Sequence, residues 1–175
     1  MRRYNYLHNL RFQICIVLTI FVLSSLCSIS INATSLNIDG ANETIVSKTV
    51  EYFDDGNSVI ITIAERVAKV ADRATAYSKS GSKTYTMCNS SGNVLWKFTV
   101  HGTFSVNAGV SATCTKTSYS TSNIASGWSL KTGSSYASGN KAIGDGTFEH
   151  KVLFIVTETK SCHVVLTCDV NGNLS

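Results

Sequence analysis

The chain has 175 residues, of which 15% are charged, a formal net charge of +4 and no proline. Three of its basic residues, Arg2, Arg3 and Arg11, precede the first apolar run, and the remainder of the chain is nearly neutral. A nearly neutral chain lacks the basic surface that nucleic-acid binding needs, so we expect no nucleic-acid partner.

The first predicted element is a signal peptide over residues 1–33. Its arginines precede an apolar run over residues 12–29, and small polar residues then lead to Ala33. This order of charged, apolar and small residues is typical of a cleaved export signal, so we predict a secreted, extracellular protein. The alternative is that the run is retained as an anchor, since its length is close to that of a membrane span. In that case the signal segment is the only expected contact with a membrane.

Residues 34–80 are predicted to form an N-terminal hairpin followed by a linker. Two β-rich runs, residues 45–53 and 58–64, flank the sequence DDGN, which is a strong turn signal. Residues 64–76 are ambiguous, because their alanines favour a helix but no residue caps its end. Residues 78–82, with the sequence SKSGS, indicate a linker.

Residues 81–175 carry a repeated two-residue pattern. It is clearest over residues 93–106, where Trp96 and Phe98 share one parity with four other apolar residues and Lys97 shares the other with polar ones. Gly102 within this run indicates a bulge or a close backbone approach. Shorter β-rich runs follow at residues 110–115, 127–132, 142–151, 152–159 and 162–168, with turn residues between most of them. This spacing predicts an all-β fold, a single antiparallel β-sandwich of immunoglobulin-like type.

Four cysteines follow the predicted signal peptide: Cys88, Cys114, Cys162 and Cys168. An even number in an exported chain predicts two disulfide bonds, and no C-x-x-C pair indicates zinc. Cys162 and Cys168 are six residues apart on one predicted strand, about 20 Å, which is too far for a bond between them. Two pairings remain open, Cys114–Cys168 with Cys88–Cys162, and the crossed pairing.

A set of cysteine, aromatic and turn motifs runs through most of the exported part of the chain. The motifs are EYFDDGNS (residues 51–58), KTYTMCNSSGNVLWKFTVHGTF (83–104), TCT (113–115), GW (127–128), SGN (138–140) and VVLTCDVNGNLS (164–175). In this combination the chain resembles a group of small exported β-sandwich proteins of Gram-positive bacteria. The resemblance implies no activity. It does imply a bond between Cys114 and Cys168, which match the usual pair of the group, and an added bond between Cys88 and Cys162.

The sequence contains no motif of a known catalytic machinery. The patterns G-x-S-x-G, H-E-x-x-H and G-x-x-x-x-G-K are all absent. His101, His150 and His163 are scattered over predicted strands, where a surface histidine is the usual case. We therefore predict no catalytic residue, no cofactor and no metal site.

Acidic residues offer two weaker signals. The pair Asp54 and Asp55, or Asp145 with Glu149, could serve as the two carboxyl groups of a glycosidase, but nothing in the sequence brings them together. The sequence DVNGN beginning at Asp169 is like the start of a calcium loop. Its glycine is in the wrong place and no distal carboxylate follows, so we predict a turn.

Three classes of function remain. The favoured one is a non-catalytic binding or adhesion module that contacts an extracellular protein or glycan through its loops. The first alternative is an antibacterial or membrane-active effector, for which the amphipathic strand at residues 93–106 is the candidate inserting element. The second alternative is a cell-wall or glycan hydrolase, which would need converging carboxylates or a Cys/His site.

Overall fold

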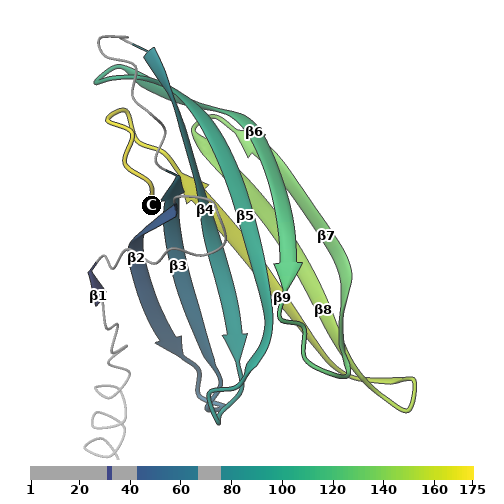
Figure 1. Cartoon of the computed structure of the whole chain (residues 1–175). Helices are drawn as coiled ribbons and strands as arrows, with labels where there is room; N and C mark the ends of the chain where they lie inside the picture. The colour runs from purple at the N-terminus through teal and green to yellow at the C-terminus, as the bar shows by residue number, and fades with distance from the viewer. Residues whose placement is uncertain (1–30, 33–42, 67–75) are drawn as a thin grey trace, which may run out of the picture.

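The computed structural model describes residues 31–32, 43–66 and 76–175, and these ranges contain β-strands and no helix (Figure 1). The strands are β1 (Ile31–Asn32), β2 (Glu43–Tyr52), β3 (Ser58–Arg66), β4 (Ala76–Cys88), β5 (Val94–Asn107), β6 (Ser111–Ser122), β7 (Trp128–Ser138), β8 (Lys141–Val152) and β9 (Ile155–Thr167). The all-β prediction is confirmed. Apart from β1, the predicted signal peptide lies outside the described residues, as does most of the ambiguous segment at residues 64–76. None of the described residues forms a helix able to cross a bilayer.

The strands form two antiparallel sheets in which neighbours in sequence are neighbours in space. One sheet has the order β1-β2-β3-β4-β5-β6 and the other β7-β8-β9. The described strands therefore form two meanders, whereas an immunoglobulin-like domain needs strands that cross between its sheets. The immunoglobulin-like part of the prediction is wrong because, among the described strands, each pairs with its neighbour in sequence within the same sheet.

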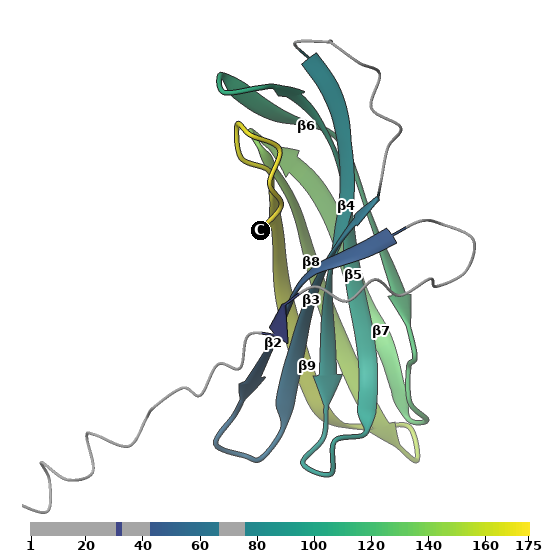
Figure 2. The same cartoon turned by 60° about the vertical axis from the view of Figure 1, so that its left-hand side comes forward.

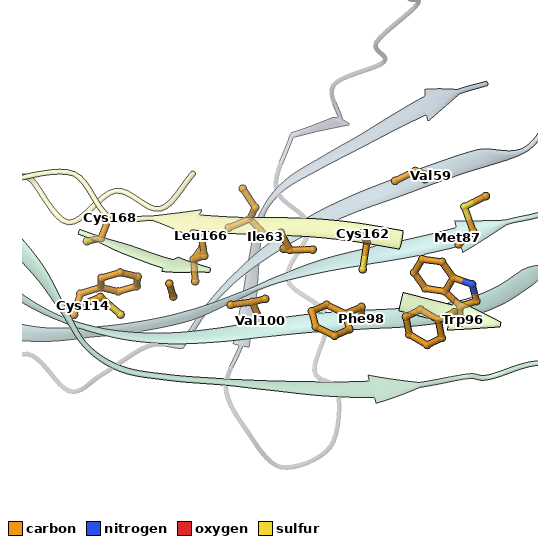
Figure 3. Close-up of a cluster of buried hydrophobic side chains, with 14 of the residues drawn as sticks. Val59, Ile63, Met87, Trp96, Phe98, Val100, Cys114, Cys162, Leu166 and Cys168 are labelled. Carbon is orange, nitrogen blue, oxygen red and sulfur yellow. The ribbon is translucent and has the colours of Figure 1, made fainter. Parts of the chain in front are cut away.

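The two sheets pack against each other and enclose one hydrophobic core (Figures 2 and 3). The alternation predicted over residues 93–106 is confirmed, because one parity of β5 is buried from Trp96 to Val106. Its buried side chains are Trp96, Phe98, Val100, Phe104 and Val106. From the facing sheet, Phe148 of β8 and Leu166 of β9 complete the centre of the core. The other parity of β5 is polar and forms the outer surface of its sheet.

Two glycines allow the layers to approach closely. A Cβ on Gly146 of β8 would lie 2.7 Å from the ring of Phe98, so only glycine leaves room for that ring. A Cβ on Gly102 of β5 would lie 3.0 Å from Cβ of Ala142 and 2.7 Å from the ring of Phe104. The close approach that the sequence indicates at Gly102 is therefore present, and a register shift lies beside it between Thr103 and Phe104.

The predicted linker at residues 78–82 is wrong, because the segment lies within β4. Its backbone pairs with β3 on one side and β5 on the other. Ser80 also shares a hydrogen bond of 3.2 Å with the hydroxyl of Thr103 across the strands. Serines and a glycine are thus accommodated in a strand because both of its edges are paired. The predicted hairpin at residues 45–53 and 58–64 is present as β2 and β3, within the same sheet as β4.

All four cysteines are buried thiols in the structure, so neither predicted disulfide is present in it. Cys162 and Cys168 lie on the buried face of β9 and its extension, as expected from their even spacing. The backbones of Cys114 on β6 and of Cys168 form hydrogen bonds with adjacent residues of the β7–β8 turn. The Cys114 N–H donates to the carbonyl of Gly139 (2.8 Å) and the Cys168 N–H to that of Asn140 (3.0 Å). These two cysteines lie at one end of the core, with Cys162 farther along it (Figure 3).

Candidate functional site

Most exposed apolar side chains lie at one end of the molecule, which carries the β2–β3, β6–β7 and β8–β9 connections (Figure 1). They are Tyr52, Phe53, Ile124 and the five residues from Val152 to Val156. Toward the opposite end the exposed large apolar residues of the described chain are Val110, Val170 and Tyr136, which lies near the β7–β8 turn. Binding residues concentrate in loops held by a rigid scaffold, so this end is the first place to look for a site.

A pocket of about 440 Å³ opens at this end, between the β2–β3 turn and strands β4, β5 and β9. Its walls are Phe53, Asp54, Asp55, Tyr85, Met87, Trp96, Lys160 and Ser161. The volume lies within the range of about 300–1,000 Å³ that is usual for small-molecule sites. We name it the end pocket. It combines aromatic walls with a charged rim, and both sheets contribute to it.

Two aromatic residues of the end pocket, Tyr85 and Trp96, belong to a stack of three rings. Trp96 lies between Tyr85, at 5.8 Å between ring centroids, and Phe148, at 4.0 Å, and all three rings are nearly parallel. The stack is fixed because β4, β5 and β8 each contribute one ring. Burial raises the pKa of Tyr85 to about 12, so its hydroxyl stays protonated and can donate a hydrogen bond. The indole Nε1 of Trp96 is buried and has no acceptor among the described residues.

The rim of the end pocket carries a bridge between the two sheets. Nζ of Lys160 on β9 lies 3.7 Å from Asp55 in the β2–β3 turn and 3.0 Å from Glu158. The backbone N–H of Asn57 donates to Asp55 (2.9 Å). This hydrogen bond, with smaller contributions from the Asn57 side chain and Lys160, holds the pKa of Asp55 below its usual value. Asp55 is therefore an ionised acceptor at neutral pH.

The three histidines singled out from the sequence do not come together. His101 lies on the outer surface of the larger sheet, where Nε2 is 3.0 Å from Oγ of Ser120. His163 lies on the smaller sheet, with Nδ1 at 2.6 Å from Asp145. His150, near the end of β8, bonds to Thr157. None of them lines the end pocket.

The structure also shows where the carboxyl groups of the two predicted pairs lie. Glu149 lies between Lys131 (2.6 Å) and Lys151 (3.4 Å), while its proposed companion Asp145 bonds to His163. Asp54 and Asp55 line the end pocket, and Asp145 and Glu149 do not. The segment DVNGN is a turn, in which Asp169 accepts bonds from the backbone of Asn171 and Asn173 (both 2.8 Å). Within the described ranges no three His, Cys, Asp or Glu side chains are grouped closely enough for a metal ion.

The cysteines are poorly suited to nucleophilic chemistry. Burial raises the pKa of Cys162 to about 12, and it also raises the pKa of Cys114 and Cys168. The thiolate is the reactive form of cysteine, so these groups are almost entirely unreactive at neutral pH.

Two features of this end were missed by sequence reasoning. The end pocket is assembled from four separate segments, and no local pattern signals such a meeting. The β8–β9 turn consists of Leu153 and Phe154, which lack the glycine or asparagine of a usual turn. The signal that was present is a run of five apolar residues, VLFIV, which is too long for a strand with one polar face.

Comparisons with protein-family models, with curated proteins and with solved structures give no match. The end pocket and the neighbouring turns are therefore interpreted from their own chemistry.

Proposed function

We propose that the chain is a secreted, non-catalytic β-sandwich module that binds a saccharide unit of an extracellular glycan in the end pocket. The observation that supports this most directly is the composition of the pocket, where apolar rings and carboxyl groups share a volume of about 440 Å³. A sugar ring presents an apolar face of C–H groups and an edge of hydroxyls. It therefore matches a site with both kinds of wall.

A saccharide is favoured over a folded protein as the ligand of this site because the pocket is concave and small. Protein partners usually contact a broad surface of about 800 Å² on each side. The end pocket instead provides fixed acceptors in Asp54 and Asp55 and donors in Lys160, Ser161 and Tyr85. Sugar hydroxyls both donate and accept, so they can use each of these groups.

The unpaired indole of Trp96 also supports a polar ligand. A buried donor without an acceptor costs about 1–3 kcal/mol. Nε1 of Trp96 belongs to a residue that lines the pocket and has no partner in the described chain. A ligand oxygen that reached it would remove this cost.

Oxidation of the cysteines belongs to the same proposal. We infer that the exported protein joins Cys114 to Cys168, and Cys88 to Cys162. For the first pair, support comes from the adjacent backbone bonds that both residues make to Gly139 and Asn140. The second pair remains a prediction from the sequence.

The binding proposal is tested by titrating the protein with a panel of soluble oligosaccharides, including peptidoglycan fragments, in a calorimeter. Phe53→Ala and Asp54→Asn should each weaken binding of a sugar that the panel identifies by about tenfold, or about 1.4 kcal/mol. Tyr136→Ala is the matched control, since Tyr136 is exposed on β7 away from the pocket. Absence of any binding sugar, or equal binding by all variants, would contradict the proposal.

An assay for reaction products distinguishes a glycan hydrolase from a module that only binds glycan. Incubation of each glycan with the protein should release no new reducing ends. If hydrolysis occurs, and if replacing His101, His150 and His163 together by glutamine lowers it more than tenfold in a folded protein, the module is an enzyme. A tenfold change corresponds to about 1.4 kcal/mol in the barrier.

A further inference from the structure

The β8–β9 hairpin ends in an apolar tip that the fold itself does not require. Its turn residues Leu153 and Phe154 are 86% and 99% exposed, and Ile155 is 69% exposed. Val152 and Val156 on either side are also exposed. We call these five residues the hairpin tip. It extends from the end of the smaller sheet in both views (Figures 1 and 2).

The backbone of the hairpin tip is unfavourable for its residues. Val152 pairs with Ile155, so Leu153 and Phe154 form a two-residue turn, and both have positive φ (49° and 69°). Such turns favour Asn-Gly, because side chains with a Cβ rarely adopt this conformation. Backbone strain combined with full exposure of large apolar side chains indicates a role outside the fold.

The distribution of apolar side chains around the tip narrows the choice of partner. Successive residues of a strand point to opposite faces, so five consecutive apolar residues make both faces of the hairpin apolar. A protein groove would cover one face of a hairpin and leave the other in water. A lipid bilayer surrounds an inserted tip on all sides, and therefore accommodates this arrangement.

The residues above the tip suit the polar surface of a membrane. Lys151 adjoins the tip, and its amino group and that of Lys131 on β7 both lie near Glu149. On β9, Glu158 lies opposite His150 and its carboxylate is 3.0 Å from Lys160, so this level of the hairpin carries charged groups of both signs. Also on β9, Thr157 bonds to His150 and closes the apolar segment with polar groups. Lysine side chains next to an apolar segment can reach lipid phosphates.

We infer that the hairpin tip inserts into the interfacial region of a lipid bilayer and holds the domain at a membrane surface. Five residues of hairpin reach less than about 10 Å, which is enough for the headgroup boundary but far from a span of about 30 Å. This contact is separate from the predicted signal segment. The inference does not rest on the proposed glycan site.

The sequence alone suggested a membrane-active effector as an alternative function, with residues 93–106 as the strand that would insert. In the structure its apolar side chains from Trp96 to Val106 are fully buried in the core, so the strand could insert only after unfolding. The hairpin tip can insert without any change of fold. The proposed contact is therefore attachment to a membrane rather than its perforation.

The test uses the full chain and vesicles of phosphatidylcholine, with and without phosphatidylserine. Because an apolar run of this length, such as residues 12–29, can bind lipid on its own, every comparison is between variants that keep it. Leu153→Asn with Phe154→Gly supplies the preferred turn residues and removes the two most exposed apolar side chains. We expect this double variant to bind vesicles at least tenfold more weakly than the wild type. Val110→Asn, at an exposed turn of the opposite end, should leave binding unchanged.

Insertion is measured directly with tryptophan as a probe. Tryptophan fluorescence of Phe154→Trp should be quenched by lipids brominated on their acyl chains, and that of Val110→Trp should not. Equal vesicle binding by the wild type and the double variant, or no additional quenching in Phe154→Trp, would overturn the inference. A change of oligomeric state in the double variant without a change in lipid binding would show that the tip contacts protein instead.

Discussion

At the level of single residues, the β8–β9 turn is where local conformation and residue type disagree most. Leu153 and Phe154 have positive φ, and of the other described residues with positive φ only Asn123 is not glycine. A left-handed conformation costs an L-residue about 1–2 kcal/mol. Because neither side chain is buried, packing within the described chain does not offset this cost.

We predict that Leu153→Asn with Phe154→Gly stabilises the protein by about 1–2 kcal/mol, because Asn-Gly suits the turn and removes the conformational cost. For a chain of this size the midpoint of thermal unfolding should rise by several degrees. The measurement is thermal unfolding followed by circular dichroism, without lipid. The single variant Phe154→Ala is the control, since it removes the apolar ring and leaves the unfavourable φ. A double variant no more stable than this control would show that the turn is not strained.

At the level of elements, three turns share one design. The sequences FDDGN (residues 53–57), NSSGN (89–93) and DVNGN (169–173) each pair their first and last residues by a backbone bond and turn at a glycine with positive φ. In the last two, the side chain of the first residue also accepts bonds from backbone N–H groups two and four positions on. These turns fix the β2–β3 and β4–β5 connections and fold the C-terminal segment back along β9.

Asp169 makes the third turn sensitive to acid. Hydrogen bonds from the Asn173 side chain, and then from backbone N–H groups, hold the pKa of Asp169 below its usual value. A carboxyl group with a lowered pKa stabilises the folded state fully above its unfolded pKa of about 3.9. This contribution is lost as the pH falls through the lower folded value.

We therefore predict that Asp169→Asn changes the pH dependence of stability. The free energy of unfolding should be higher for the wild type than for the variant near neutral pH, and the difference should shrink below about pH 4. Urea unfolding of both proteins between pH 2 and 7 measures it. A difference that stays constant over this range would mean that the charge of Asp169 has no role.

Local sequence patterns predicted the strands that have one polar and one apolar face, such as β5. They also predicted the turns that contain glycine, and both are found as expected. The segment SKSGS was misassigned because its place in β4 depends on strands on both sides, which composition does not express. The end pocket was not predictable, since residues from 53 to 161 meet there only after the sheets pack.

At the level of the whole molecule, the chain passes from one sheet to the other once, through the β6–β7 connection. Cys168 lies in the C-terminal segment that follows β9. A Cys114–Cys168 bond would add a second covalent link between the sheets, at the end away from the pocket. Closing a loop of this length should stabilise the protein by about 4 kcal/mol in the chain-entropy model.

We predict that Cys114→Ala with Cys168→Ala lowers the midpoint of thermal unfolding of the oxidised protein more than Cys88→Ala with Cys162→Ala. The reason is that both residues of the first pair are held against the same β7–β8 turn by backbone hydrogen bonds. Peptide mapping without reduction identifies the bonds directly. A Cys162–Cys168 bond, or four free thiols in protein recovered outside the cell, would refute the predicted pairing.

The meander order of the sheets has a consequence for how the chain folds. Each named strand pairing in the described chain joins strands consecutive in sequence, so most loops that must close are short. All-β proteins usually fold slowly because their contacts are distant along the chain. Here each hairpin can form as soon as its second strand is available, so structure can grow in the order of synthesis or export. Only the docking of β7–β9 onto the first sheet has to wait for the end of the chain.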